Sequence, residues 1–170
     1  MSEKIKEFEM NDEEIKDYMQ AKEEDYIAGL LAAADFVDTE TQEINIVRDG
    51  RKFFSFRIHA ISEEMLNDIR KKYTKFAKNR RAGIKVAEEV DQPKYRASII
   101  YNSTVEEDKA KLWDNKQVQE ALRAKGKLIM NALDVIDAVL LPGEKDRVMD
   151  LIDEFNGFGN EDIKIETAKN

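Results

Sequence analysis

The residues whose types and spacing could do chemistry in this chain are two carboxylates, one histidine and a run of cations. Asp134 and Asp137 stand one helical turn apart among apolar residues, where two carboxylates could act as general acid and base. The alternative is a boundary position at which they face solvent or a lysine. His59 is the single histidine. Since no partner residue is recognisable, we interpret it as a partly exposed strand residue.

The densest charge is cationic: residues 70–81 contain seven bases and no acid. The bases are Arg70, Lys71, Lys72, Lys75, Lys78, Arg80 and Arg81. One hypothesis is a phosphate-binding patch, as in a small regulatory nucleic-acid-binding protein. Two structural alternatives stand beside it. Cations are favoured at a helix C-terminus by the macrodipole, and this cluster could pair with the acidic N-terminal residues, within or between subunits.

Several chemistries are excluded by composition or lack a motif. The chain has no cysteine, which excludes disulfides, thiolate metal sites and cysteine nucleophiles. A single histidine also excludes a multi-histidine metal site. We find no phosphate-binding glycine loop, no Gly-x-Ser-x-Gly elbow and no calcium-loop spacing. We therefore expect a protein that is not an enzyme and has no cofactor.

The overall composition indicates one soluble domain with a small core. The chain has 170 residues, of which 42% are hydrophobic and 38% charged, and its net charge is −8. Such an acidic chain should repel nucleic acid and anionic membranes. No signal peptide is recognisable, and no apolar run reaches the roughly 18 residues that span a bilayer. We therefore expect a cytoplasmic protein.

The N-terminal segment is expected to be a short arm followed by a helix. Residues 1–10 are charged and lack apolar spacing, which predicts a flexible arm. Asn11 or Asp12 can cap a helix with acids in its first turn, and apolar spacing continues to about Phe36. Residues 1–40 contain 13 acids and 4 bases. This charge is interpreted as a solvated helix face or as an acidic surface that recruits a basic partner.

The strongest β signal lies at residues 43–60, where Asp49-Gly50 indicates a hairpin turn. A two-residue turn with regular pairing would put Ile44 on the face of Ser55. We therefore predict a three-residue loop, residues 48–50, which puts Ile44 and Ile46 on the face of Phe54, Phe56 and Ile58. That face must pack on helices, because an isolated hairpin is only marginally stable.

Helical patterns dominate the remainder. Ser62 can cap a helix that carries the cation cluster, and residues 82–91 read as a polar connector. Further helices are predicted to begin near residues 93, 115, 126 and 142. The last of these should end before Gly157, and residues 159–170 should form a disordered tail. The predicted fold is mainly α (α+β), a single helical domain at residues 11–158 with one antiparallel β-hairpin near residues 43–60.

Four apolar residues are candidate partner-binding positions: Trp113, Leu140, Leu141 and Phe158. Trp113 stands with Leu112 in a charged stretch that we predict to be a loop, where it could anchor a partner or fill the core. The last two predicted helices should also share a core. That core should contain Leu133, Ile136, Leu140, Leu151 and Phe155.

The order of several motifs resembles the XkdN-like phage tail assembly chaperones over residues 44–158. After the hairpin come Ala60-Ile61-Ser62-Glu63-Glu64 and Arg70-Lys71-Lys72-Tyr73-Thr74, and a short helix then ends near Ser103-Thr104-Val105. The turn Leu140-Leu141-Pro142-Gly143-Glu144 and the ending Ile152-x-x-Phe155-Asn156-Gly157-Phe158 complete the pattern. Residues 114–127 depart from it, being richer in charge and glutamine.

This resemblance implies a non-enzymatic protein that acts during the assembly of a phage or prophage tail in the cytoplasm of the bacterial host. Proteins of this family bind the tape measure protein, a very long helical chain with exposed apolar stretches. They keep it soluble while tail tube subunits are recruited, and they are absent from the finished particle. The family has no catalytic residues to carry over. Binding would be of the helix-in-groove kind, with affinity from apolar anchors.

The resemblance also implies a second, longer product in some members, made by a −1 ribosomal slip near the C-terminus. Ala168-Lys169-Asn170 can be encoded as GCA AAA AAC, which contains the slippery run A AAA AAC. The hypothesis is that a −1 reading frame appends a domain that recruits a partner such as the tail tube protein. Residues 161–170 would then serve as the linker.

Overall fold

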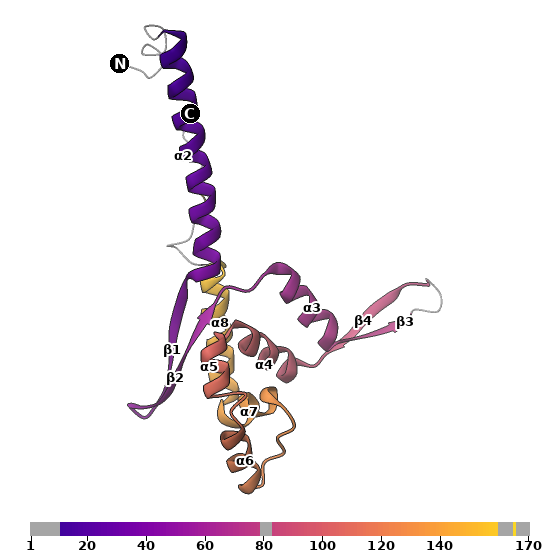
Figure 1. Ribbon diagram of the computed structural model, residues 1–170. Coiled ribbons are helices and arrows are strands. Elements are labelled where there is room, and N and C mark those ends of the chain that lie inside the picture. Colours follow the sequence, from indigo (N-terminus) through magenta and orange to yellow (C-terminus); the bar gives the residue numbers. More distant parts are fainter. Residues whose placement is uncertain (1–10, 79–82, 160–164, 166–170) are drawn as a thin grey trace. The chain divides into compact units, whose positions relative to one another are not determined.

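The computed structural model describes residues 11–78, 83–159 and 165. They belong to two compact units, Met1–Glu40 and Thr41–Asn170 (Figure 1). The predicted N-terminal arm, residues 1–10, lies outside the described residues. So does the predicted tail, except for Gly159 and Ile165. The fold is mainly α with a small β part, as predicted, and no described helix is both long and apolar enough to cross a membrane.

The first unit is built on one helix, α2 (Asp12–Thr39). Its N-cap is Asn11, whose side chain accepts from the backbone N–H groups of Glu13 and Glu14 at 3.0 and 2.9 Å. The Glu14 carboxylate accepts from the Asn11 backbone N–H in return, which completes a capping box. No residue of this 28-residue helix is buried.

The second unit begins with a hairpin of β1 (Thr41–Arg48) and β2 (Arg51–His59). Its apolar side chains share one face as predicted, because Ile44 pairs with Phe56 and Ile46 with Phe54. This face packs into the core of the unit. The prediction of the face was therefore right.

The predicted three-residue hairpin loop is wrong. Arg48 pairs with Arg51, so that the loop has two residues, Asp49 and Gly50, with φ angles of 49° and 75°. Both angles lie in the left-handed region, as the favoured two-residue turn of a hairpin requires. A bulge between Ile46 and Val47 leaves Phe53 as the extra residue on β2 and restores the alternation. Regular pairing after a two-residue turn would have put Ile44 on the face of Ser55, and the bulge prevents this.

The cation-rich segment departs most from the sequence prediction. Helix α3 (Glu63–Tyr73) is capped by Ser62 as expected, but it ends at Tyr73 rather than continuing through the cluster. The chain then enters β3 (Thr74–Lys78), which pairs antiparallel with β4 (Lys85–Val90). The predicted connector at residues 82–91 is thus largely a strand. Threonine, phenylalanine and valine favour strands, and pairing between two segments outweighs the helical preference of the lysines.

Five further helices complete the second unit. They are α4 (Gln92–Ser103), α5 (Glu106–Lys111), α6 (Lys116–Ala124), α7 (Ala132–Val139) and α8 (Pro142–Phe155). The predicted helix start at residue 126 is wrong, because Asn131 caps α7 with a capping box and delays its start. The charged stretch before Trp113 is the short helix α5 rather than a loop.

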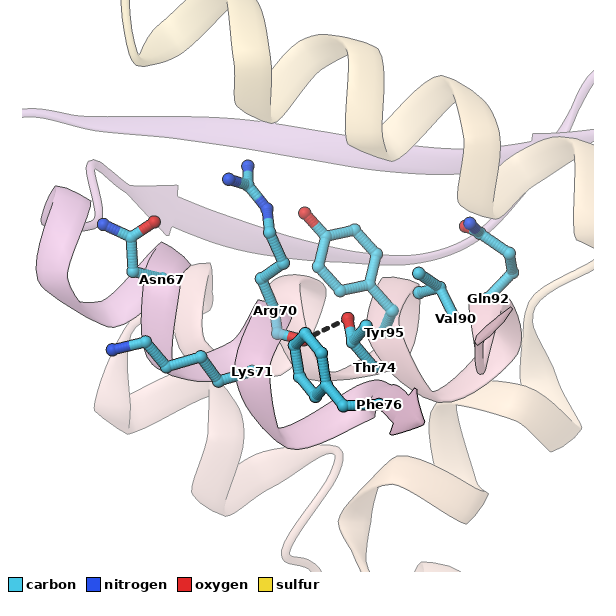
Figure 2. A pocket seen from close by; sticks show the side chains of 8 residues that line it. All are labelled: Asn67, Arg70, Lys71, Thr74, Phe76, Val90, Gln92 and Tyr95. Atoms are coloured by element: carbon cyan, nitrogen blue, oxygen red, sulfur yellow. Dashed lines mark hydrogen bonds between the residues drawn. The ribbon is translucent and has the colours of Figure 1, made fainter. Parts of the chain in front are cut away.

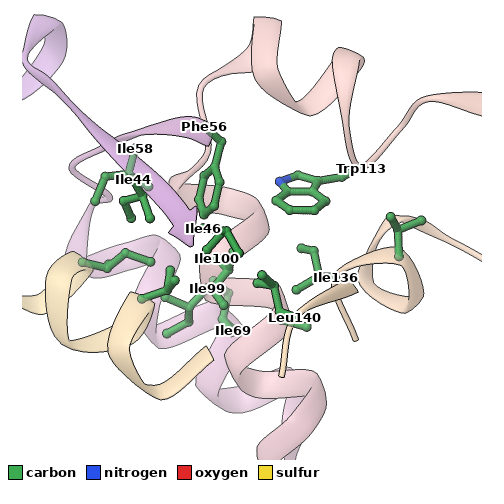
Figure 3. Close-up of a cluster of buried hydrophobic side chains, with 14 of the residues drawn as sticks. Ile44, Ile46, Phe56, Ile58, Ile69, Ile99, Ile100, Trp113, Ile136 and Leu140 are labelled. Atoms are coloured by element: carbon green, nitrogen blue, oxygen red, sulfur yellow. The ribbon is translucent and has the colours of Figure 1, made fainter. Parts of the chain in front are cut away.

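The core of the second unit surrounds α4, which contacts α3, α7 and α8 (Figure 3). Ile99 and Ile100 of α4 are buried among side chains from the β1–β2 hairpin and from α7 and α8. As predicted, Ile136 and Leu140 lie in this core. The other predicted members are partly buried against it: Leu133, Leu151 and Phe155.

Trp113 fills the other end of this core. Its side chain is 1% exposed, and its ring lies 5.4 Å from that of Phe56 in an edge-on arrangement. The indole N–H donates to Thr104 Oγ1 at 3.0 Å, and Thr104 is itself completely buried. The polar atom of the indole is therefore satisfied inside the core, as burial requires.

Candidate functional site

A hollow of about 450 Å³ lies in the second unit, where α3, the β3–β4 hairpin and the start of α4 meet (Figure 2). We call it the basic groove. It is lined by Asn67, Arg70, Lys71, Thr74, Phe76, Val90, Gln92 and Tyr95. No acidic side chain is among these residues.

The unpredicted hairpin is what creates the basic groove. Thr74 ends α3 by donating its hydroxyl to the Arg70 carbonyl at 2.6 Å, and the chain then turns into β3. On the other side of the hairpin, the backbone N–H of Asp91 donates to the Tyr73 carbonyl at 2.9 Å. These two bonds hold the base of the hairpin against the end of α3. Phe76 and Tyr95 thereby line the same hollow.

The groove combines an apolar floor with cations at its rim. Phe76 is 50% exposed, although an aromatic ring of this kind gains stability when it is covered. Arg70 and Lys71 are exposed, and neither forms an ion pair with a described residue. A complementary ligand would offer apolar side chains flanked by carboxylates.

The predicted basic cluster is divided by the fold. Arg70 and Lys71 line the groove, whereas Lys72 Nζ lies over the Tyr73 ring and Lys75 pairs with Glu89 at 3.6 Å. Arg80 and Arg81 lie outside the described residues, and so does the side chain of Lys78. The described cations therefore do not form the continuous row that tracks a nucleic-acid backbone.

A second candidate surface lies on α2 of the first unit. Residues 26–34, Tyr-Ile-Ala-Gly-Leu-Leu-Ala-Ala-Ala, contain no charged side chain, and we call them the uncharged segment. Within it Tyr26 is 73% exposed and Leu30 72%. The whole helix nevertheless carries nine acids and two lysines. A contiguous exposed apolar surface rimmed by charge is typical of an interaction site.

The four apolar residues predicted to bind partners fall into two groups. Trp113 and Leu140 are buried in the core, so that a partner could reach them only after a rearrangement. Leu141 and Phe158 are exposed, by 55% and 64% respectively. The structure thus leaves two of the four at the surface of the second unit.

Asp134 and Asp137 lie in a network of lysines, the second of the two alternatives considered above. Lys94 Nζ is 2.5 Å from Asp134 and 3.2 Å from Asp137, and Lys145 Nζ is 2.7 Å from Asp137. Burial alone would raise the pKa of Asp134, but hydrogen bonds from Lys94 and from two backbone N–H groups outweigh it and lower the pKa. A carboxyl group held ionised in this way is a poor general acid.

Two arginines attach the hairpin to the helices. Arg48 Nε donates to Glu144 at 2.7 Å, and Arg57 donates to Asp108, which also accepts from the Arg57 backbone N–H at 2.7 Å. The hydrogen bond from Arg57 is the main cause that lowers the pKa of Asp108. These pairs are structural links between β1–β2 and the helical layer.

Among the described residues, neither His59 nor a cluster of acidic side chains forms a recognisable catalytic or metal site. His59 is partly buried, and its Nδ1 lies 2.7 Å from the Ala60 carbonyl. No group of three or more histidine, cysteine, aspartate or glutamate side chains among the described residues could hold a metal ion.

The sequence identified the cations of the basic groove but not its apolar side chains, and it did not identify the uncharged segment of α2. The helix predicted after Ser62 was extended through the cation cluster, whereas the alternation of Thr74 and Phe76 with lysines was the available sign of a strand. The apolar spacing up to about Phe36 was recognised as helical, but the nine consecutive uncharged residues at 26–34 were not considered as a surface. Such a run on a helix without buried residues is the signal that could have identified the second surface.

Comparison with known proteins gives one family. A sequence profile described as "Phage XkdN-like tail assembly chaperone protein, TAC" matches residues 27–169. No curated protein matches the chain. A solved structure described as the crystal structure of the protein yqbn is 20% identical, with a TM-score of 0.41, over 70% of this chain and 87% of that one.

Proposed function

Because the chain belongs to the family of XkdN-like phage tail assembly chaperones, we propose that it binds the tape measure protein and keeps it soluble during tail assembly. The client is a long helical chain with exposed apolar stretches. A chaperone for such a chain must offer an apolar surface and also remain soluble while it does so. We propose that the protein does this without catalysis.

The observation that carries this proposal is the uncharged segment of α2. Tyr26, Ile27, Leu30 and Leu31 are all more than half exposed. Ala28 and Gly29 lie between them and Ala32 and Ala33 follow directly, and such small residues allow a second helix to approach closely. An amphipathic client helix could therefore pack along this segment, with affinity from the large apolar residues.

The acidic residues of α2 support the same role. The helix has a net charge of −7, and the whole chain of −8. A complex coated with like charges resists association with other complexes, because strong net charge favours solubility. The apolar segment would supply binding and the flanking carboxylates solubility.

Co-expression with helical fragments of the tape measure protein tests this proposal. The readout is the amount of fragment recovered in the soluble fraction and retained by the tagged chaperone. We expect Leu30→Asp to reduce both about tenfold, because it puts a charge in the middle of the apolar contact. Leu128→Asp is the matched control, since Leu128 is 84% exposed and lies in the second unit.

Three outcomes would count against the proposal. If the unaltered protein retains no fragment, the client is wrong. If Leu141→Asp or Phe158→Asp reduces binding and Leu30→Asp does not, the client contacts the second unit instead. The nucleic-acid alternative gains support if nuclease treatment abolishes retention of the fragment. It also gains support if the protein forms a salt-sensitive complex with DNA that alanine at Arg70 and Lys71 abolishes.

Two finer elements of the role belong to the same proposal. We place its action in the cytoplasm of the bacterial host of a phage or prophage. We also propose that a longer form made by a −1 slip near residues 168–170 recruits the tail tube protein. Reading the codons decides this last point, because GCG AAG AAT would contain no slippery run.

A further inference from the structure

We propose that, before the client arrives, the uncharged segment of α2 docks into the basic groove of a second copy of this chain. Free protein with nine consecutive uncharged residues exposed on a helix would otherwise tend to associate nonspecifically. The chain itself carries a groove whose chemistry complements that helix. The docking is inferred from this complementarity alone. Only its consequence, that a client must displace the second copy, rests on the proposed function.

The groove provides one half of the match. Its volume of about 450 Å³ can take several side chains from one face of a helix rather than a whole helix. Phe76, Val90 and Tyr95 offer apolar contacts to such side chains. The exposed guanidinium of Arg70 and the ammonium of Lys71 stand beside them, in a hollow without a lining acid.

Helix α2 provides the other half. Tyr26 and Leu30 are four residues apart and therefore lie on one face of the helix. Glu23 precedes Tyr26 by one turn, and Asp35 and Asp38 follow the uncharged segment. Carboxylates thus flank the uncharged segment at both ends, but only Glu23 lies near the face of Tyr26 and Leu30, because Asp35 and Asp38 are turned away from that face. A helix seated with Tyr26 and Leu30 on the floor would bring Glu23 towards the cationic rim.

Charge also favours docking of α2 into the groove over docking of α2 against the α2 of another copy. Each α2 has a net charge of −7, so two of these helices laid side by side in parallel would repel one another. Against the groove the same charge is attractive. When each of two copies offers its helix to the other, the exchange is reciprocal and closes as a dimer.

Sedimentation of the full chain at several protein concentrations, without client, tests this inference. We expect a monomer–dimer equilibrium that weakens as the salt concentration rises from about 0.05 M to about 0.5 M, because exposed ion pairs are screened. Arg70→Glu combined with Lys71→Glu should raise the dimer dissociation constant about tenfold or more. Leu30→Asp, made on the helix, should do the same.

The matched control is Lys116→Glu with Lys127→Glu, which makes the same change of charge at exposed positions outside the groove. It should leave the dissociation constant within about twofold of the unaltered protein. Circular dichroism of each variant shows whether the helices persist. Mixing the groove variant with a Glu23→Lys copy should restore dimers, since the reversed charges then attract again.

The results separate this inference from the proposed function. A monomer at every concentration overturns the docking. A dimer that is insensitive to Arg70 and Lys71, or a cross-link between α2 and the groove that forms within one chain, also overturns it. The tape measure assay is scored independently, so that either proposal can fail while the other stands.

Discussion

Helices α2 and α4 differ sharply in how much of their surface is buried. Helix α2 has 28 residues and buries none of them, whereas α4 has 12 and buries five. Both contain isoleucine and tyrosine, and both begin at a side-chain cap. Apolar content therefore does not decide which helix becomes core. The position of α4 against three other helices does.

This difference separates two uses of apolar surface. In α4 the apolar residues are packed tightly and hold the second unit together, so that substitutions in this core lower the free energy of unfolding. In α2 they stay exposed and flanked by carboxylates, as expected of a surface that awaits another chain. If this view is right, substitutions in the two helices should have opposite profiles: stability falls in α4, and binding falls in α2.

The largest effect is expected for Ile100→Ala in α4. Ile100 is 0% exposed, and truncating a buried isoleucine removes apolar burial and leaves a cavity. We expect the free energy of unfolding to fall by about 2–5 kcal/mol, measured by urea denaturation. Leu140 is 3% exposed, and Leu140→Ala should lower the free energy of unfolding by a similar amount. A change within experimental error at either position would mean that the packing around α4 is wrong.

The next effect concerns the buried indole. Thr104→Val keeps the shape of the side chain and removes the hydroxyl that accepts from Trp113 Nε1. An unsatisfied buried donor costs about 1–3 kcal/mol. Since Trp113 is the single tryptophan, its fluorescence reports the unfolding of the second unit directly. Thr104→Ser retains the hydroxyl and is the control. Equal losses for both variants would point to packing rather than to the hydrogen bond.

A pH-dependent effect should follow from Asp108. In the folded protein the hydrogen bond from Arg57 lowers the pKa of the Asp108 carboxyl group below its ordinary value of 3.8. Stabilisation from a lowered carboxyl pKa is complete above the unfolded value and is lost as the pH falls through the folded one. Asp108→Asn should therefore cost about 1–2 kcal/mol at pH 7. The gap between variant and unaltered protein should narrow below a pH of about 4. A gap that is constant with pH would exclude the charged interaction as its source.

The two asparagine caps allow a direct test of the comparison. Asn11 caps α2 and Asn131 caps α7, each within a capping box. Asn131→Ala should lower the free energy of unfolding of the second unit by about 1 kcal/mol, because α7 packs in its core. Asn11→Ala should reduce the helical signal in circular dichroism and leave that transition in place. If Asn11→Ala shifted the tryptophan-monitored midpoint equally, α2 would contribute to the stability of the second unit.

The smallest effect is expected for Leu30→Ala in α2. Leu30 is exposed, so its truncation should change the free energy of unfolding by less than about 0.5 kcal/mol. The same variant should weaken retention of tape measure fragments. A loss of stability comparable with that of Ile100→Ala would remove the distinction between the two helices.

The sequence by itself determined the class of the fold, the family and the features that local chemistry controls. Ser62 and the Asp49-Gly50 turn were read correctly as a cap and a hairpin, because caps and tight turns depend on a few adjacent residues. The shared face of Ile44 and Ile46 with Phe54 and Phe56 followed from their alternation. The order of the motifs was enough to indicate the chaperone family.

Only the tertiary structure decided where the surfaces lie. Helical spacing predicted that the lysine-rich stretch is one helix. Instead β3 is stabilised by pairing with β4, which begins eleven residues after the start of β3. The bulge at Ile46 and Val47 is likewise a property of two strands together. Trp113 and Leu30 are both large and apolar, yet one is buried and the other exposed. The periodicity of one segment shows which side chains share a face, whereas burial depends on what the rest of the chain brings against that face.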